Sequence, residues 1–201
     1  TGSTRVVSIF ASSLGDICDG QLREMIDAHQ TGLTRESYEK RIYGKTASLF
    51  AGSAEMGAVI GEAPETHIQA LRQYGSDVGM AFQIIDDILD LTQESDGIGK
   101  PAGNDLRQGT VTLPVMLYAR QLDPDGREKR ALDAAIKGET EDRAAMDDVV
   151  RAIRTSSAID ESFEAARVFT EQAKQRIELV PDQSSRDMLA EIADLAIRRV
   201  S

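Results

Sequence analysis

Apolar residues recur at helical spacing along most of the chain, and no segment alternates apolar and polar residues convincingly enough to predict a strand. Thr34 is a suitable N-cap for one helix, and Pro64 is suited to open the next. A break is expected near Gly20 in the first helix. The pattern predicts an all-α helical bundle with helices over residues 5–30, 34–61, 64–93, 115–121, 127–136, 141–154, 159–179 and 184–200.

The third predicted helix carries an unusual polar stripe in its segment GMAFQIIDDILDL, residues 79–91. At about 100° per residue, one arc of about 100° collects one amide and three carboxylates, and aliphatic residues cover the rest. Carboxylates this close repel, and each is costly beside a core unless it is paired, so we expect a cation. Oxygen ligands without a nearby His or Cys favour Mg²⁺ or Ca²⁺ over zinc. The stripe consists of Gln83, Asp86, Asp87 and Asp90.

Adjacent aspartates more often mark a solvated helix face than a site. Asp147 and Asp148 are interpreted in that way, because nothing polar follows them at helical spacing. Around Asp86 this interpretation is weaker, since the segment is among the most apolar in the chain. Single residues are interpreted conservatively as well: Cys18 as a small buried side chain, and His29 and His67 as surface residues.

A glycine-rich loop, DGIGKPAGNDLRQGTVTLP at residues 96–114, follows the acidic helix and contains Lys100 and Arg107. Glycines let a backbone approach a ligand closely, and basic side chains hold phosphate oxygens, although an ordinary connector would also be glycine-rich. Lys45 and Thr46 add a cation and a hydroxyl within a small, apolar segment, where a buried lysine needs an anion. Together the three segments predict a site for a Mg²⁺-diphosphate.

Charge and composition narrow the function further. The formal net charge of −11 disfavours nucleic-acid binding, which needs a basic face. No apolar run approaches the length of a transmembrane helix, and no signal peptide is visible, so we expect a cytoplasmic protein without a transmembrane segment.

Three segments, KTASLFAGSAEMGA, FQIIDDILD and GKPAGNDLRQGTVTLP, closely resemble the second half of the trans-isoprenyl diphosphate synthases, or polyprenyl synthetases. They occur in family order, and the resemblance covers nearly all 201 residues. It implies one helical domain of the isoprenoid synthase type over residues 1–201. It also implies that Asp86, Asp87 and Asp90 help to bind Mg²⁺ on an allylic diphosphate, and that the same diphosphate is held by Lys45, Thr46, Gln83 and Lys100.

The resemblance implies Mg²⁺-dependent condensation of isopentenyl diphosphate with an allylic diphosphate by a homodimeric enzyme. The loop GKPAGNDLRQGTVTLP resembles that of medium- to long-chain polyprenyl synthases more than that of short-chain farnesyl synthases, which implies a product of geranylgeranyl length or longer. Two alternatives stay open: a noncatalytic or split subunit of a heteromeric prenyl synthase, and a terpene-cyclase-like enzyme. The intact aspartate motif argues against a noncatalytic subunit, and the FQIIDDILD and GKPAGNDL segments argue against a terpene-cyclase-like enzyme.

The chain also departs from the family pattern. No first aspartate-rich motif precedes Asp86, and the segment DICD at residues 16–19 lacks adjacent carboxylates, so we interpret it as the polar face of a helix. Thr110 stands where many family members have lysine. The chain begins without methionine in what resembles the middle of a family helix. We therefore expect the C-terminal portion of a longer enzyme, inactive by itself, whose apolar helix faces are covered by the remaining half or by a second copy.

Overall fold

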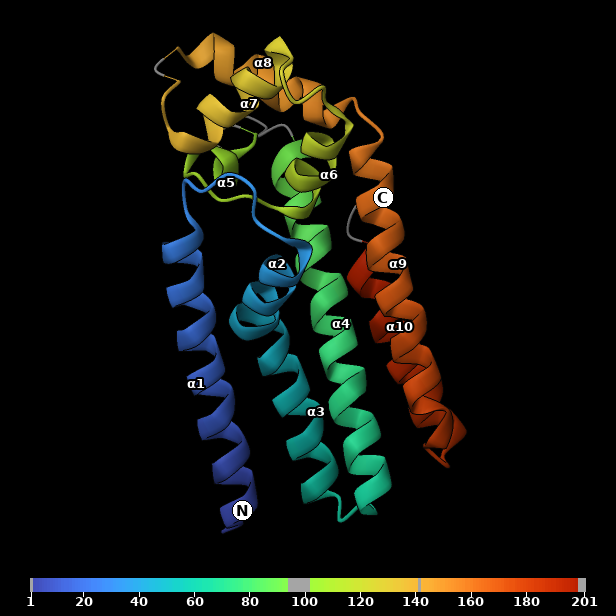
Figure 1. The fold of residues 1–201 in the computed structure, drawn as a ribbon. Helices are drawn as coiled ribbons and strands as arrows, with labels where there is room; N and C mark the ends of the chain where they lie inside the picture. Colours follow the sequence, from blue (N-terminus) through green and yellow to red (C-terminus); the bar gives the residue numbers. More distant parts are fainter. Residues whose placement is uncertain (1, 94–101, 141, 199–201) are drawn as a thin grey trace. The chain divides into compact units, whose positions relative to one another are not determined.

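The computed structural model describes residues 2–93, 102–140 and 142–198, and every regular element in these ranges is a helix (Figure 1). The predicted all-α class is therefore confirmed. The longer helices are α1 (Thr4–Asp27), α3 (Ser48–Ile60), α4 (Glu65–Thr92), α9 (Ala158–Arg176) and α10 (Gln183–Arg198). The shorter elements are α2 (Arg35–Ile42), the π-turn η1 (Tyr43–Ala47), α5 (Asn104–Arg107), α6 (Leu113–Gln121), α7 (Arg127–Lys137), α8 (Arg143–Arg154) and the 3₁₀ turn η2 (Ile177–Leu179).

Most predicted boundaries are close to the observed ones, with two instructive differences. The Thr34 hydroxyl accepts a hydrogen bond from the backbone N–H of Ser37 at 3.1 Å, which confirms the predicted cap. The expected break near Gly20 is wrong, because α1 continues through it. Gly20 is needed for close packing: a Cβ there would lie 2.2 Å from the backbone nitrogen of Lys45.

The described chain forms two compact units. Unit 1 comprises residues 1–23, 39–85 and 165–201, and unit 2 comprises residues 24–38 and 86–164. No helix among the described residues is both long and apolar enough to span a membrane.

Small residues bring the helices of unit 1 together (Figure 1). A Cβ on Gly75 of α4 would lie 2.4 Å from the carbonyl oxygen of Phe50 on α3, and a Cβ on Gly79 would lie 2.5 Å from the Cα of Ala47 in η1. The glycines of α4 therefore permit the close approach of α3 and η1. The buried Tyr74 on α4 also donates a hydrogen bond to the carbonyl of Leu189 on α10 at 2.8 Å.

Unit 2 is held together at a loop around His29, which adopts a left-handed backbone conformation with φ of 63°. Its backbone N–H donates to the carbonyl of Gly109 at 2.9 Å, and its ring Nδ1 lies 3.0 Å from the carbonyl oxygen of Ile136 on α7. A Cβ on Gly109 would lie only 2.3 Å from that Nδ1. His29 is exposed, as expected, yet its ring joins three segments of unit 2.

Cys18 corrects another sequence-based interpretation. Its thiol is exposed on α1 and forms no disulfide, whereas a small buried side chain was expected. Residue type misled here: free cysteines are usually buried, but α1 buries only Ser13 and Gly20.

Candidate diphosphate-binding site

Thr46 and Gln83, two of the predicted site residues, meet in unit 1. The Thr46 hydroxyl in η1 donates a hydrogen bond to the Gln83 side-chain oxygen on α4 at 2.6 Å. The close approach of Gly79 to Ala47 brings η1 against α4 and so permits this contact. Both side chains are partly exposed.

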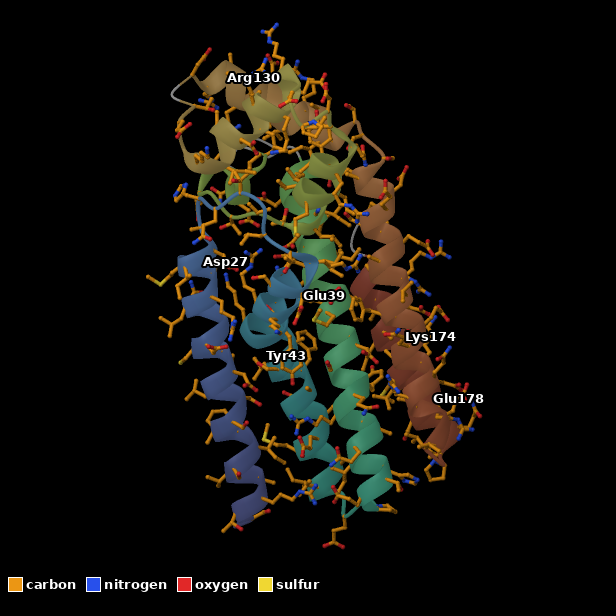
Figure 2. The ribbon with its side chains drawn as sticks, in the orientation of Figure 1. Asp27, Glu39, Tyr43, Arg130, Lys174 and Glu178 are labelled. Carbon is orange, nitrogen blue, oxygen red and sulfur yellow. The ribbon has the colours of Figure 1, made fainter. Side chains whose placement is uncertain are left out.

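Lys45 is exposed, which contradicts the sequence-based view that it is buried and for that reason needs an anion. The buried positions of η1 are Gly44 and Ala47, and the Lys45 backbone packs against Gly20 while its side chain extends outwards. An exposed ammonium group still suits a role in phosphate binding, because it is a flexible point charge with three donors. Figure 2 labels Tyr43, the first residue of η1, which shows where this turn lies.

The three aspartates of α4 differ sharply in burial. Asp86 is exposed, Asp90 is partly exposed, and Asp87 is only 4% exposed. The expectation that each carboxylate of the stripe lies beside the core is therefore wrong for Asp86, which is exposed to solvent. The gradient separates the roles that these carboxylates can play, since only Asp86 and Asp90 present oxygens to the surface.

Asp87 is tied to a buried tyrosine. The hydroxyl of Tyr38, itself 1% exposed, donates a hydrogen bond to the Asp87 Oδ2 atom at 2.7 Å. A hydrogen bond to a charged acceptor is short and strong, and it offsets part of the cost of burying the carboxylate. Sequence reasoning missed Tyr38. The only signal was a single aromatic residue in the otherwise very polar segment RESYEKRI.

Asp90 anchors the short helix α5. Its carbonyl accepts the N–H of Gly103 at 2.7 Å, and its Oδ2 atom accepts the N–H of Asp105 at 3.1 Å. Burial raises the pKa of the Asp90 carboxyl above its usual range; the backbone N–H groups of Asp105 and Asn104 oppose that increase, and the nearby Asp86 adds to it. The predicted loop is therefore attached directly to the acidic stripe.

Two glycines of the loop pack closely against side chains from other segments of unit 2. Gly103, with φ of 73°, would place a Cβ 2.5 Å from the Val150 side chain, and Gly109, with φ of 78°, packs on the His29 ring. Their conformations thus serve packing within unit 2. Lys100, the predicted phosphate ligand, lies outside the described residues.

Arg107 is engaged within unit 2. Its guanidinium forms an ion pair with Asp147 on α8 and donates to the carbonyl of Ala102 at 3.2 Å. Asp147 keeps 44% of its side chain exposed, as expected for a surface residue, but nothing in the sequence indicated this ion pair. Arg107 therefore acts first as a bridge between the loop and α8. Asp148 is exposed, as expected.

The donor set fits a divalent cation that arrives with a phosphate ligand. Among residues 2–93, 102–140 and 142–198, no group of three or more His, Cys, Asp or Glu side chains is arranged to hold a metal ion. Mg²⁺ commonly binds through one or two carboxylates and substrate phosphates, with water completing its coordination. Asp86 and Asp90 supply two such carboxylates one helical turn apart, so they fit this mode better than a closed protein cage.

Comparisons with known proteins agree with this chemistry. A sequence model of the family described as "Polyprenyl synthetase" matches residues 1–153. The chain is 38% identical over 96% of its length to the heptaprenyl diphosphate synthase component 2 of Geobacillus stearothermophilus, and it covers 58% of that protein. It is 32% identical to the nonaprenyl diphosphate synthase of Mycobacterium tuberculosis over 96% of its length, and it covers 57% of that protein.

Solved structures extend the comparison to the fold. The crystal structure of a decaprenyl diphosphate synthase from Rhodobacter capsulatus matches 100% of this chain and 61% of its own, with a TM-score of 0.90 and 32% identity. A polyprenyl synthase from Caulobacter crescentus, crystallised with calcium and isoprenyl diphosphate, matches 99% and 60% of the two chains, with a TM-score of 0.91 and 32% identity. The chain spans just under three-fifths of the length of the two curated relatives. It belongs to the polyprenyl synthetase family.

Proposed function

We propose that this chain provides the diphosphate-binding part of a Mg²⁺-dependent trans-prenyltransferase, which condenses isopentenyl diphosphate with an allylic diphosphate. The carboxylate pair of Asp86 and Asp90 on α4 carries the proposal, together with the anchoring of α5 by Asp90. Family membership supports the reaction class.

The chain's residues would bind and orient the allylic diphosphate. Asp86 and Asp90 would hold Mg²⁺, which when bound supplies positive charge to the leaving diphosphate. In unit 1, Lys45 and Gln83 are proposed as donors to phosphate oxygens, and Thr46, whose hydroxyl donates to the Gln83 side-chain oxygen, as the residue that orients the Gln83 amide. Lys100 is proposed as a further phosphate ligand, and Asp87 as a structural support of the stripe rather than a direct metal ligand.

The bond changes balance without a redox partner. The allylic C–O bond breaks as its electron pair leaves with diphosphate, and the double bond of isopentenyl diphosphate forms the new C–C bond. Loss of a proton, accepted by the departing diphosphate, restores a double bond. Neutralising charge on the leaving group is the contribution that these residues make. Apolar helix faces are suited to keeping water away from the reacting carbon.

The product is proposed to be of geranylgeranyl length or longer. The names of the relatives support this, because they include a heptaprenyl and a nonaprenyl synthase. No first aspartate-rich motif lies within these 201 residues, so we infer that they do not turn over substrate by themselves. We place the enzyme in the cytoplasm.

Assembly with another chain is part of the proposal. Large apolar side chains are exposed along the unit 1 part of α1, at Val7, Phe10, Leu14 and Leu22. Contiguous exposed apolar surface of this kind often marks an interface. We propose a homodimer as the first candidate assembly. A two-component synthase is the second candidate, because the Geobacillus relative is named as component 2. Light scattering of the purified chain, alone and with a candidate partner, separates the two.

A thermal-shift experiment tests the metal and diphosphate binding. Inorganic diphosphate should raise the melting temperature with Mg²⁺ present and not with EDTA, because a ligand that binds the folded state stabilises it by mass action. Asp86→Asn should abolish the shift. Asp148→Asn is the matched control, since it also neutralises an exposed helical aspartate and should leave the shift intact. Equal shifts in Mg²⁺ and EDTA would refute the metal-bridged site.

A further inference from the structure

Unit 2 contains a cavity of about 350 Å³, which we call the α6–α7 pocket; none of the aspartates of the α4 stripe lines it. Its volume falls at the small end of the range of ligand pockets, roughly 300–1,000 Å³. The floor is aliphatic and well buried, with side chains from the segment before α6, from α6 and from α7: Val111, Leu113, Val115, Leu117 and Ile136.

Basic side chains surround this apolar floor. Arg35 at the start of α2, Arg120 near the end of α6 and Lys129 on α7 line the pocket, together with a single acid, Asp133. Lys129 pairs with Asp133 at 2.5 Å. Within the described ranges, Arg120 is exposed and makes no ion pair. The lining therefore carries a surplus of positive charge, although the whole chain has a net charge of −11.

The pocket is preformed because His29 fixes two of its walls. Its backbone N–H bonds to Gly109, just before Val111, and its ring bonds to the carbonyl of Ile136 on α7. The pocket residues Gly32 and Arg35 follow His29 closely in the chain and are held near α7 by these contacts. A ligand would therefore not have to order this loop, which reduces the entropic cost of binding.

We propose that the α6–α7 pocket binds a soluble anionic amphiphile, a single aliphatic chain that ends in a phosphate or carboxylate. The chain lies on Leu113, Leu117 and Ile136, and the head group is held by Arg120 with Arg35 and Lys129 around it. Apolar surface favours the tail, and guanidinium groups favour the oxygen-rich head. The site is separate from the proposed reaction, and it stands whether or not that reaction is correct.

Calorimetric titration with octyl phosphate and octanoate tests the site. EDTA is present throughout, which suppresses metal-dependent diphosphate binding. We expect saturable binding of either anion and much weaker binding of the neutral octanol. Arg120→Gln should weaken binding by about three- to tenfold, the range for a partly exposed charged contact. Ala119→Trp, which fills the pocket from α6, should abolish it.

Arg130→Gln is the matched control: it removes an exposed arginine from α7, labelled in Figure 2, that does not line the pocket. Absence of saturable binding would overturn the proposal, as would equal losses in Arg120→Gln and Arg130→Gln, or full binding by a folded Ala119→Trp variant. Flotation with phosphatidylglycerol vesicles separates the sources: Arg120-dependent flotation without octyl phosphate binding would assign a membrane surface instead and refute the soluble ligand. The Mg²⁺-dependent diphosphate shift should persist in Arg120→Gln, so each proposal can fail alone.

Discussion

The Tyr38 hydroxyl and the Asp87 carboxylate form a buried hydrogen bond of 2.7 Å, which ties α2 to the C-terminal part of α4 within unit 2. Two adjacent aspartates in the same motif therefore have different environments. Asp86 faces solvent, whereas Asp87 is held inside by a tyrosine. The motif thus combines an exposed position, which is suited to binding a metal, with a buried position that has a structural role.

Tyr38→Phe should lower the free energy of unfolding by about 1–3 kcal/mol, because it removes the donor from a buried carboxylate. Urea unfolding measures the loss. Tyr118→Phe is the matched control: this tyrosine is also buried, and its hydroxyl makes no hydrogen bond to a described residue, so the change should stay within about 0.5 kcal/mol. Similar losses in both variants would show that the Tyr38–Asp87 hydrogen bond adds nothing measurable to the free energy of unfolding.

Gly79→Ala should destabilise the chain by about 1–3 kcal/mol, the range for overpacking, because the new Cβ would meet the Ala47 backbone at 2.5 Å. Gly57→Ala in α3 should do the opposite. Nothing lies within 4 Å of its Cβ position, so removing a helical glycine should stabilise by about 0.5–1 kcal/mol. Thermal and urea unfolding of both variants provide the comparison, and a neutral Gly79→Ala would contradict the packing of η1 on α4.

Asp90→Ala should expose the Asp105 amide to hydrogen exchange, since its acceptor is the Asp90 side chain. We expect protection to fall by about tenfold, the equivalent of one hydrogen bond. The Gly103 amide should stay protected because it bonds to the Asp90 carbonyl, which the substitution retains. Asp90→Asn, which keeps a side-chain oxygen, should protect both. Loss of both amides in Asp90→Ala would instead mean that α5 unfolds as a unit.

The Tyr74 phenol should titrate late, because burial raises its pKa to about 12. The unfolded chain ionises near the ordinary value of about 10. The stabilisation from this folded-state shift is therefore complete below pH 10 and is lost as the pH rises towards 12. Ultraviolet titration of the wild type against Tyr74→Phe isolates the signal. A Tyr74 midpoint near 10 in the folded protein would contradict the buried hydrogen bond to Leu189.

The spacing of apolar residues was sufficient to predict the helical class and most helix positions, because the buried face of an amphipathic helix repeats about every three to four residues along the sequence. The site was only partly predictable. Sequence spacing placed the aspartates on one face of α4, but their burial depends on what packs beside them. Tyr38 packs on Asp87 and buries it, whereas Asp86 is exposed. Lys45 was misjudged for the same reason, since the exposed side of η1 is set by its packing on Gly20.

Contacts between residues that are far apart in the sequence could not be predicted either. Nothing near His29 indicates that its ring reaches Ile136, and nothing near Arg107 indicates an ion pair with Asp147. Each joins segments separated by dozens of residues, so single-chain spacing carries no information about it. Charge type suggested phosphate binding for Arg107, and the tertiary contact gave it an internal role first.

The π-turn η1 places one residue more in its segment than an α-helix would hold, and this sets the phase between α2 and α3. Each residue of an α-helix advances its face by about 100°. Excising a single residue from η1 would leave a continuous α-helix with the same helical content, but everything beyond the excision would be turned by about that angle. Lys45 and Thr46 would then lose their alignment with Gln83, and Ala47 and Phe50 would lose their close contacts with Gly79 and Gly75. The alignment of this part of the site thus depends on the number of residues in one turn as much as on their chemical identity.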